Sequence, residues 1–594
     1  MKRISTFLLI VPFLLASCSN NERGIVFLSS TRRFLTYYRD SYFFRPSSEY
    51  SQQIAVASFA SAMASCDDDG KYETYGTNLS NLWKKEGFSN IYINDDYKVR
   101  PTMDSVGFGI ASKKISEFNL VAVTIRSGGY DAEWASNFTI GTSGHSKGFD
   151  ESSDIVINGL FEYITTHNIT GLTKIWITGY SRGAAITNLA AGKILQSIND
   201  GTYPNSLDTG KDDVYAYCFE PPSGACTTIE EATSDLYNGI HNILNYNDLV
   251  PTLAPYDWGF VRYGQPHYFP DRITDIYFNS SERKKMVSNY HFSTGAHNMP
   301  DYEVDDWKFY KVDDETAASK NLPVDALYPS QGRFAHQFVH TMMTGFINRE
   351  NFATLYEDSV RNMFAACFGI NPVIGEMSLA GNVILDIIFS YSFIQTMLLE
   401  LQEGNFGGFA GDVEFLFYLI LNANKDNIDE IKSLYEGIYY FLTFLGPSIV
   451  ARNDLMLQFF SRDNLINIIA PHYFEFNYSF LKSCDSRLYG SNACKFNDGT
   501  YQILHVKNPT SVKIYETHLK KRVFTFANGT TSSDTLAAEK LADGSLNIFL
   551  PNNGEYKYSI EASEITLFKV NEYGEETLFI DALPLIATIN QVTE

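Results

Sequence analysis

A serine flanked by two glycines is the residue of this chain with the clearest potential for covalent chemistry. Ser181 lies in Gly179-Tyr-Ser-Arg-Gly183, directly after the apolar stretch Lys174 to Thr178 and before a helical pattern that starts near Ala184. Glycines two residues to either side of a serine permit the strained strand-to-helix turn that exposes its hydroxyl at the edge of a sheet. The pattern indicates a nucleophilic serine, and an ordinary serine in a tight turn is the alternative.

A serine hydroxyl becomes nucleophilic when a histidine takes its proton and a carboxylate orients that histidine. Asp248 follows the apolar stretch Ile240 to Tyr246, so it lies at the end of a predicted strand, where such a carboxylate is expected. A solvated loop aspartate is the alternative. Two histidines compete for the role of base: His297 in Ala-His-Asn-Met-Pro, and His472 in Ala-Pro-His-Tyr-Phe-Glu, beyond a long helical stretch.

The elements around these residues alternate between short strands and helices. The predicted strands are 119–126, 174–178, 214–219 and 240–246, and the predicted helices between them are 155–166 and 184–198. This alternation implies an α/β protein with a mostly parallel sheet covered by helices on both faces. Before this sheet, residues 25–65 are rich in Tyr and Phe with helix-like spacing.

The second half of the chain has a different character. Long apolar helical patterns dominate residues 324–466 and include 377–401, which carries Asp386 within its apolar span. A charge at that place favours a buried helix or a lipid-facing cap over a transmembrane helix. Beyond Lys495, short stretches separated by Gly, Asn, Asp and Pro predict a small all-β module.

The composition excludes one class of partner. A hydrophobic fraction of 44% with 19% charged residues is that of a globular protein. The formal net charge of -23 would repel phosphate backbones, so nucleic acid is not an expected partner.

The N-terminus carries the pattern of an export signal. Lys2 and Arg3 precede the apolar run Phe7 to Leu15, which is too short for an ordinary transmembrane helix. The ending Leu-Ala-Ser-Cys18 resembles the lipobox of bacterial lipoproteins, in which the cysteine is acylated and becomes the mature N-terminus. A plain signal peptide with an incidental cysteine is the alternative. Several acyl chains on Cys18 would hold the protein stably at a membrane.

The other six cysteines are an even number in an exported and therefore oxidising setting. Cys484 and Cys494 could pair, or they could be separate buried thiols. Their spacing fits no metal motif.

The order of motifs resembles the class 3 lipase family over roughly residues 75–265. Val121 to Arg126 is similar to the family's strand before its oxyanion turn, and His145-Ser-Lys-Gly-Phe149 is similar to its H-x-x-G-F element. Gly179 to Gly183 resembles its serine elbow. Phe219-Glu-Pro221 resembles its F-G-x-P strand end, and Asn247-Asp-Leu-Val-Pro251 resembles its N-D-x-V-P acid motif.

The resemblance implies an α/β-hydrolase-like fold with a catalytic triad of Ser181, His472 and Asp248. His472 is preferred over His297 because its segment resembles the H-Y-x-E segment of a bacterial subgroup with long insertions and a C-terminal β module. The backbone N–H of Arg182 is one implied oxyanion donor, and the second is that of Gly128 or of its neighbour Ser127. No metal and no cofactor is implied.

The chain departs from the family's pattern beside the proposed nucleophile. It has Tyr180 and Arg182 where the family usually has His and Leu, and Ser127 where the family usually has Gly. The expectation that follows from Arg182 is a guanidinium beside the acyl site, which would favour anionic substrates.

Together these patterns predict five segments. They are a lipoprotein signal peptide over 1–17, the first part of an α/β-hydrolase domain over 18–299, a helical insertion over 300–463, the completion of the hydrolase domain over 464–493, and a β-sandwich-like module over 494–594. The expected function is hydrolysis of lipid or similar small acyl esters at a bacterial envelope membrane, on its extracytoplasmic side. A peptidase or thioesterase on the same elbow is one alternative, and a catalytically inactive lipid- or glycan-binding surface lipoprotein is another. The oligomeric state is left open.

Overall fold

The computed structural model describes most of residues 23–269, residues 348–361, a few positions between 399 and 411, and most of residues 472–590. Cys18 and the proposed signal peptide lie outside the described residues. So does most of the proposed helical insertion, within which the short helix α11 (Arg349–Leu355) is described.

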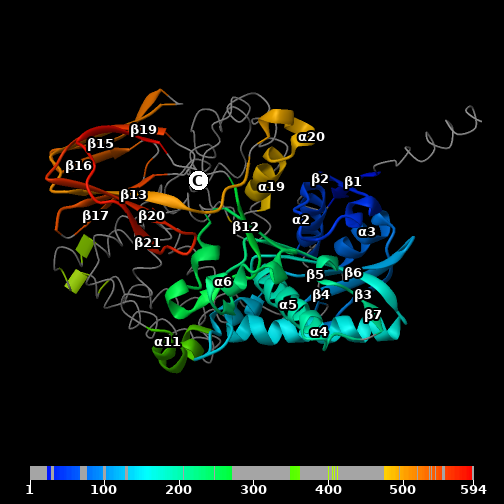
Figure 1. Ribbon diagram of the computed structural model, residues 1–594. Helices are drawn as coiled ribbons and strands as arrows, with labels where there is room; N and C mark the ends of the chain where they lie inside the picture. The colour runs from blue at the N-terminus through cyan, green and yellow to red at the C-terminus, as the bar shows by residue number, and fades with distance from the viewer. Residues whose placement is uncertain are drawn as a thin grey trace, which may run out of the picture.

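An eight-stranded sheet forms the centre of the N-terminal part (Figure 1). Its strand order is β12-β10-β8-β6-β5-β4-β3, and β7 pairs with β6. Strands β5, β6, β8, β10 and β12 are mutually parallel, whereas β3 and β4 run antiparallel to their neighbours. The bounds are β3 Ser89–Ile93, β4 Phe108–Ile115, β5 Phe118–Ile125, β6 Gly171–Tyr180, β7 Leu207–Asp208, β8 Val214–Phe219, β10 Ile240–Leu244 and β12 Gln265–Tyr268.

Helices cover both faces of this sheet, which explains why its central strands read as continuous apolar runs. On one face, α2 (Gln52–Cys66) and α3 (Thr77–Glu86) share a core with Trp176 of β6. On the other face, α4 (Lys147–Thr166) and α5 (Arg182–Asn199) share a core with Ile175 and Ile177. The architecture confirms the predicted α/β fold of the α/β-hydrolase type.

The helix-like spacing predicted from residue 25 onward is wrong for its first part. There β1 (Arg23–Leu28) and β2 (Arg33–Tyr38) pair as an antiparallel hairpin, and the helix α2 begins only at Gln52. The hairpin residues are mainly β-branched and aromatic, types that fit a pleated surface, so pairing between the two strands prevails over the apparent helical period.

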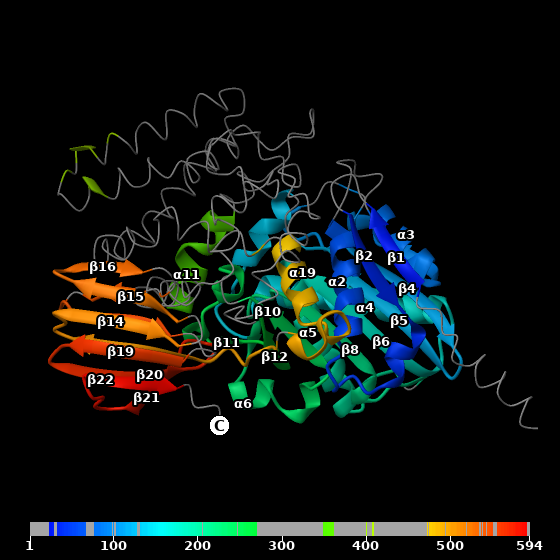
Figure 2. The same cartoon turned by 90° about the horizontal axis from the view of Figure 1, so that it is seen from above.

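Two antiparallel sheets of five strands each form the C-terminal part (Figure 2). One has the order β17-β18-β13-β20-β21 and the other β16-β15-β14-β19-β22, and apolar side chains of both sheets fill a common core. Their bounds are β13 Tyr501–Lys507, β14 Ser511–Glu516, β15 Lys521–Ala527, β16 Thr530–Ser533, β17 Ala538–Lys540, β18 Leu546–Leu550, β19 Glu555–Glu561, β20 Glu564–Val570, β21 Glu576–Ile580 and β22 Ile586–Asn590. The all-β character predicted beyond Lys495 is confirmed. No helix in the described part of the chain is long and apolar enough to span a membrane.

Candidate active site

The turn between β6 and α5 holds Ser181 in a strained conformation. Its φ of 54° and ψ of -123° are unusual for any residue other than glycine. A Cβ on Gly179 would lie 2.3 Å from the carbonyl oxygen of Gly183, and one on Gly183 would lie 2.6 Å from that of Ile125. Both flanking glycines are therefore required sterically, and the turn presents the serine hydroxyl at the carboxyl end of β6.

The structure brings Ser181, His472 and Asp248 together. His472 Nε2 lies 3.0 Å from Ser181 Oγ, and His472 Nδ1 lies 2.6 Å from Asp248 Oδ2. With its proton on Nδ1, the imidazole donates to Asp248 and accepts from the serine hydroxyl. The His472 side chain is 22% exposed and that of Asp248 is fully buried. This is the geometry that a serine nucleophile, a base and an orienting carboxylate require.

Asp248 is held by the loop that follows β10. Its backbone N–H donates to the carbonyl of Asn245, and its Oδ1 accepts the backbone N–H of Val250 at 2.9 Å. Because Oδ1 is occupied in this way, Oδ2 faces His472.

The helix α19 (Phe474–Ser483) begins two residues after His472 and packs against α2. The Tyr180 hydroxyl donates to the His472 carbonyl oxygen at 2.7 Å and accepts from Asn477 Nδ2 at 2.6 Å. Asn477 Oδ1 in turn accepts from Asn245 Nδ2 at 3.1 Å. A chain of hydrogen bonds therefore runs from the β10 loop, through α19 and the serine elbow, to the backbone of His472.

We expect Tyr180→Phe to lower kcat about tenfold and to destabilise the fold by about 1–3 kcal/mol. The change leaves the His472 carbonyl and the buried Asn477 amide without their shared partner, so the histidine is held less well. Ester-hydrolysis kinetics and thermal unfolding measure the two effects.

Tyr163→Phe is the matched control for this variant. The Tyr163 hydroxyl also donates to a backbone carbonyl, that of Asn90, at 2.7 Å, but it does so beside the edge strand β3. Tyr163→Phe should lower the free energy of unfolding and leave kcat unchanged. Equal losses of kcat in the two variants would contradict the positioning role of Tyr180.

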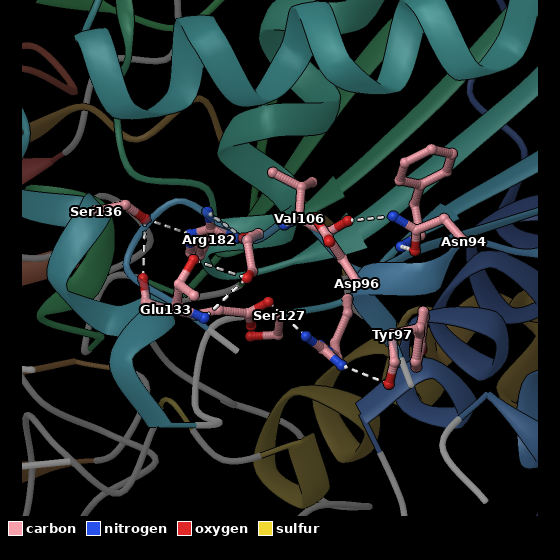
Figure 3. Close-up of polar contacts among 12 residues, drawn as sticks. Asn94, Asp96, Tyr97, Val106, Ser127, Glu133, Ser136 and Arg182 are labelled. Atoms are coloured by element: carbon pink, nitrogen blue, oxygen red, sulfur yellow. Dashed lines mark hydrogen bonds and ion pairs between the residues drawn. The ribbon is translucent and has the colours of Figure 1, made fainter. Parts of the chain in front are cut away.

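Arg182 is the first residue of α5, so its backbone N–H has no acceptor within the helix and suits the predicted oxyanion role. Its guanidinium is buried and bonded inward, with Nε donating to Ser136 Oγ at 2.8 Å and Nη2 to the Ser105 carbonyl at 3.2 Å (Figure 3). Beside it, Glu133 forms a buried ion pair with Arg126. The expectation of a guanidinium that faces an anionic substrate is therefore wrong, because internal acceptors hold this side chain.

Two sequence-predicted residues, Gly128 and His297, lie outside the described residues. The neighbouring Ser127 donates its backbone N–H to the Cys66 thiol at 3.3 Å. This N–H, the other candidate for the second oxyanion donor, is therefore engaged with a thiol.

Other described histidines have structural partners. His145 Nδ1 accepts the backbone N–H of Cys226, and His241 and His267 contact each other through their ring nitrogens at 3.0 Å. Burial lowers the pKa of His241 to about 4 and that of His267 to about 3, so both are neutral at pH 7.

Cys218 and Cys226 are free thiols, and Cys66 accepts a hydrogen bond from the Ser127 N–H. The pairing suggested for Cys484 stays a prediction, because Cys494 lies outside the described residues. In the same described ranges, no cluster of His, Cys, Asp or Glu is arranged to hold a metal ion.

A buried ion pair links the C-terminal sheets to the residues that hold the loop of Asp248, here called the acid loop. Arg262 Nη2 lies 3.0 Å from Glu572 Oε2, in the turn between β20 and β21, and Arg262 Nη1 donates to the Pro251 carbonyl. A small cleft beside Asp248 is lined by these residues and by Tyr573. Through Arg262, Glu572 of the C-terminal module therefore helps to hold the acid loop in place.

Glu572→Gln should lower the free energy of unfolding by about 3 kcal/mol, because it leaves Arg262 buried without its counter-charge. Urea unfolding measures the change. Glu564→Gln is the control, since Glu564 pairs with Lys507 at 3.6 Å with both side chains about half exposed, and such pairs contribute about 0–1 kcal/mol. Similar effects of the two substitutions would show that the Arg262 pair does not stabilise the interface.

No protein-family model matches this chain, and no curated protein matches it. Similar solved structures include the native Rhizomucor miehei lipase propeptide complex, at 16% identity and a TM-score of 0.27, over 37% of this chain and 70% of that chain. The Rhizomucor miehei triacylglyceride lipase is 17% identical with a TM-score of 0.27, over 37% and 82% of the two chains. Lipase II from Rhizopus niveus is 14% identical with a TM-score of 0.26, over the same shares. These three structures are of fungal lipases, and each is similar over 37% of this chain.

Proposed function

We propose that this chain is a serine-dependent carboxylic ester hydrolase, with Ser181 as nucleophile, His472 as base and then acid, and Asp248 as the orienting carboxylate. The supporting observation is the continuous contact from Ser181 Oγ to His472 Nε2 at 3.0 Å and from His472 Nδ1 to Asp248 Oδ2 at 2.6 Å. The strained turn at Ser181 adds to this support, because strain of this kind persists where a side chain must be presented to a substrate.

In the proposed reaction, His472 takes the hydroxyl proton of Ser181 while Ser181 Oγ attacks the ester carbonyl carbon. The oxyanion that forms accepts hydrogen bonds from the backbone N–H groups of Arg182 and Gly128. His472 then gives the proton to the leaving alcohol, and the acyl group stays on Ser181. Water, deprotonated by His472, attacks the acyl-enzyme and releases the acid.

The proposed substrates are acyl esters of glycerolipids or phospholipids, and the proposed anchor is an acylated Cys18 at a bacterial envelope membrane. Support comes from the sequence motifs, which resemble those of class 3 lipases, and from the lipobox-like Leu-Ala-Ser-Cys18. An enzyme tethered in this way would meet lipid esters in the surface that carries it.

Labelling of the purified chain with a fluorophosphonate probe tests the proposal. Mass spectrometry identifies the labelled peptide, and hydrolysis of p-nitrophenyl esters of graded acyl length measures the activity. We expect one label, on the peptide that contains Ser181, and loss of ester hydrolysis in proportion to labelling. A folded protein that neither labels nor hydrolyses any ester would favour the inactive lipid- or glycan-binding lipoprotein. Turnover of peptides or thioesters without turnover of oxygen esters would change the substrate class.

A further inference from the structure

A buried glutamate lies beside the turn that carries the proposed orienting carboxylate. Glu220 follows β8 and is fully buried, with a φ of 52°. A side chain at such a φ costs backbone energy that a glycine would not, so the surroundings must hold this residue in place. The mechanism proposed above gives this residue no task.

The surroundings of the Glu220 carboxyl group are those of a neutral acid. Its Oε2 accepts the backbone N–H of Asn245 at 2.9 Å, while its buried Oε1 meets no N–H or O–H donor in the described part of the chain. Asn245 also accepts the backbone N–H of Asp248 with its carbonyl oxygen, so the Glu220 carboxyl group lies beside the turn that carries Asp248. A hydrogen bond from Glu220 to the Asp248 carboxylate requires a proton on the Glu220 carboxyl group.

Desolvation is the largest influence on this group, and Asp248 adds to it. Together they raise the pKa of Glu220 well above its usual range, against the smaller opposing effect of Arg262. The Arg262 guanidinium is engaged with Ser223, Pro251, Tyr268 and Glu572, so Glu220 is not its counter-ion. The charged groups that act on Glu220 are Asp248 and Arg262, and His472 is bonded to Asp248 through Oδ2.

We propose that Glu220 is a positioning residue that stays protonated and donates a hydrogen bond through Oε1 to the Asp248 carboxylate, fixing that carboxylate toward His472. The inference rests on the proposed function for its kinetic consequences, but the protonation of Glu220 does not depend on it. Asp248 can accept this bond as well as those from Val250 and His472, because a carboxylate has about four acceptor sites. No net charge is added behind the triad.

Two substitutions with side chains about as long as that of glutamate distinguish the possible roles of Glu220. Glu220→Gln is neutral and keeps a donor toward Asp248, whereas Glu220→Met keeps the unbranched shape and removes the donor. We measure kcat, KM and the pH profile of kcat/KM for both, whose acid limb reports protonation of the general base.

The proposal predicts that Glu220→Gln keeps kcat within about threefold and leaves the acid limb in place. Glu220→Met should lower kcat about tenfold with little change in KM, because Asp248 is then less well aligned. It should also move the acid limb to higher pH, since the Asp248 charge is no longer shared with a donor and holds the proton on the base more strongly. A Glu220→Met variant with wild-type kcat and profile would overturn the positioning role.

An ionised Glu220 gives a different pattern. Glu220→Gln would then remove a negative charge near the base and move the acid limb to lower pH by about one unit. That result would overturn the proposal.

Infrared difference spectroscopy of wild type minus Glu220→Gln, at pH 7, tests protonation without any turnover. We expect the C=O stretch of a protonated carboxylic acid in the wild type. Its absence would overturn the inference even in an active esterase. Its presence in a protein that fails to react with the fluorophosphonate probe would refute the proposed function while leaving the neutral Glu220 established.

Discussion

Ser181→Ala and His472→Ala are each expected to lower kcat for ester hydrolysis by about 10⁵- to 10⁶-fold while leaving a folded protein. Ser181 Oγ and His472 Nε2 lie 3.0 Å apart and act as a unit, because the serine cannot attack until the histidine takes its proton. Removing either partner already disables that step. The double variant should therefore be no slower than either single variant. Steady-state rates, with thermal unfolding as the test of folding, measure this.

The two substitutions differ in their effect on stability. Alanine at position 181 keeps a Cβ at φ 54°, so the strain of the turn is unchanged. Alanine at position 472 removes the hydrogen bond from the imidazole to Oδ2 of the buried Asp248, which costs about 1–3 kcal/mol. Rate losses that add up in the double variant would mean that the two residues act independently, contrary to the proposed mechanism.

His297→Ala is the control for the identity of the base. Its rate should stay within about twofold of the wild type, because the structure pairs Ser181 with His472. A loss of activity with His297→Ala but not with His472→Ala would keep the serine mechanism and replace its base.

Local patterns in the sequence were sufficient to predict the serine elbow and the α/β sheet around it. The predicted strand 174–178 lies within β6, and the requirement for Gly179 and Gly183 is steric and confined to one turn. The buried parallel strands could be predicted because their apolar, β-branched runs are short and end at turn residues.

The contact between His472 and Asp248 could not be derived from local patterns. It joins positions 224 residues apart, and it depends on α19 packing against α2, near the start of the sheet domain. The residues next to either position in the sequence do not predict this contact. The resemblance to known motifs was needed to prefer His472 over His297.

The residues that support the triad were missed for a related reason. Tyr180 was noted only as a departure from a family pattern, yet its hydroxyl joins the elbow to the His472 segment. Glu220 gave a signal that could have been used, because a carboxylate directly after the wholly buried strand β8 has little access to water. Asn477 gave none, since a polar residue in an amphipathic helix is usually solvated.

Asp248→Asn is expected to lower kcat by about 10⁴-fold with a fold that remains intact. The carboxylate of Asp248 can only accept, so it requires the proton of His472 to sit on Nδ1, which leaves Nε2 free to accept from Ser181. An amide at this position can donate instead. The imidazole then carries its proton on Nε2, and the serine hydroxyl loses its base.

The buried neighbour of Asp248 sharpens this prediction. A neutral Glu220 can bond to either the oxygen or the nitrogen of an amide, so Asp248→Asn should not leave an unpaired charge in the site. The rise in the activation free energy of hydrolysis should therefore exceed the fall in the free energy of unfolding. Asp257→Asn, an exposed aspartate in the short helix η8 (Tyr256–Trp258) of the same region, is the control and should keep wild-type rates. Should Asp248→Asn retain more than about a tenth of the wild-type kcat, the tautomer argument fails. His472 would then need another group to orient it, and the adjacent Glu220 would be the first to replace.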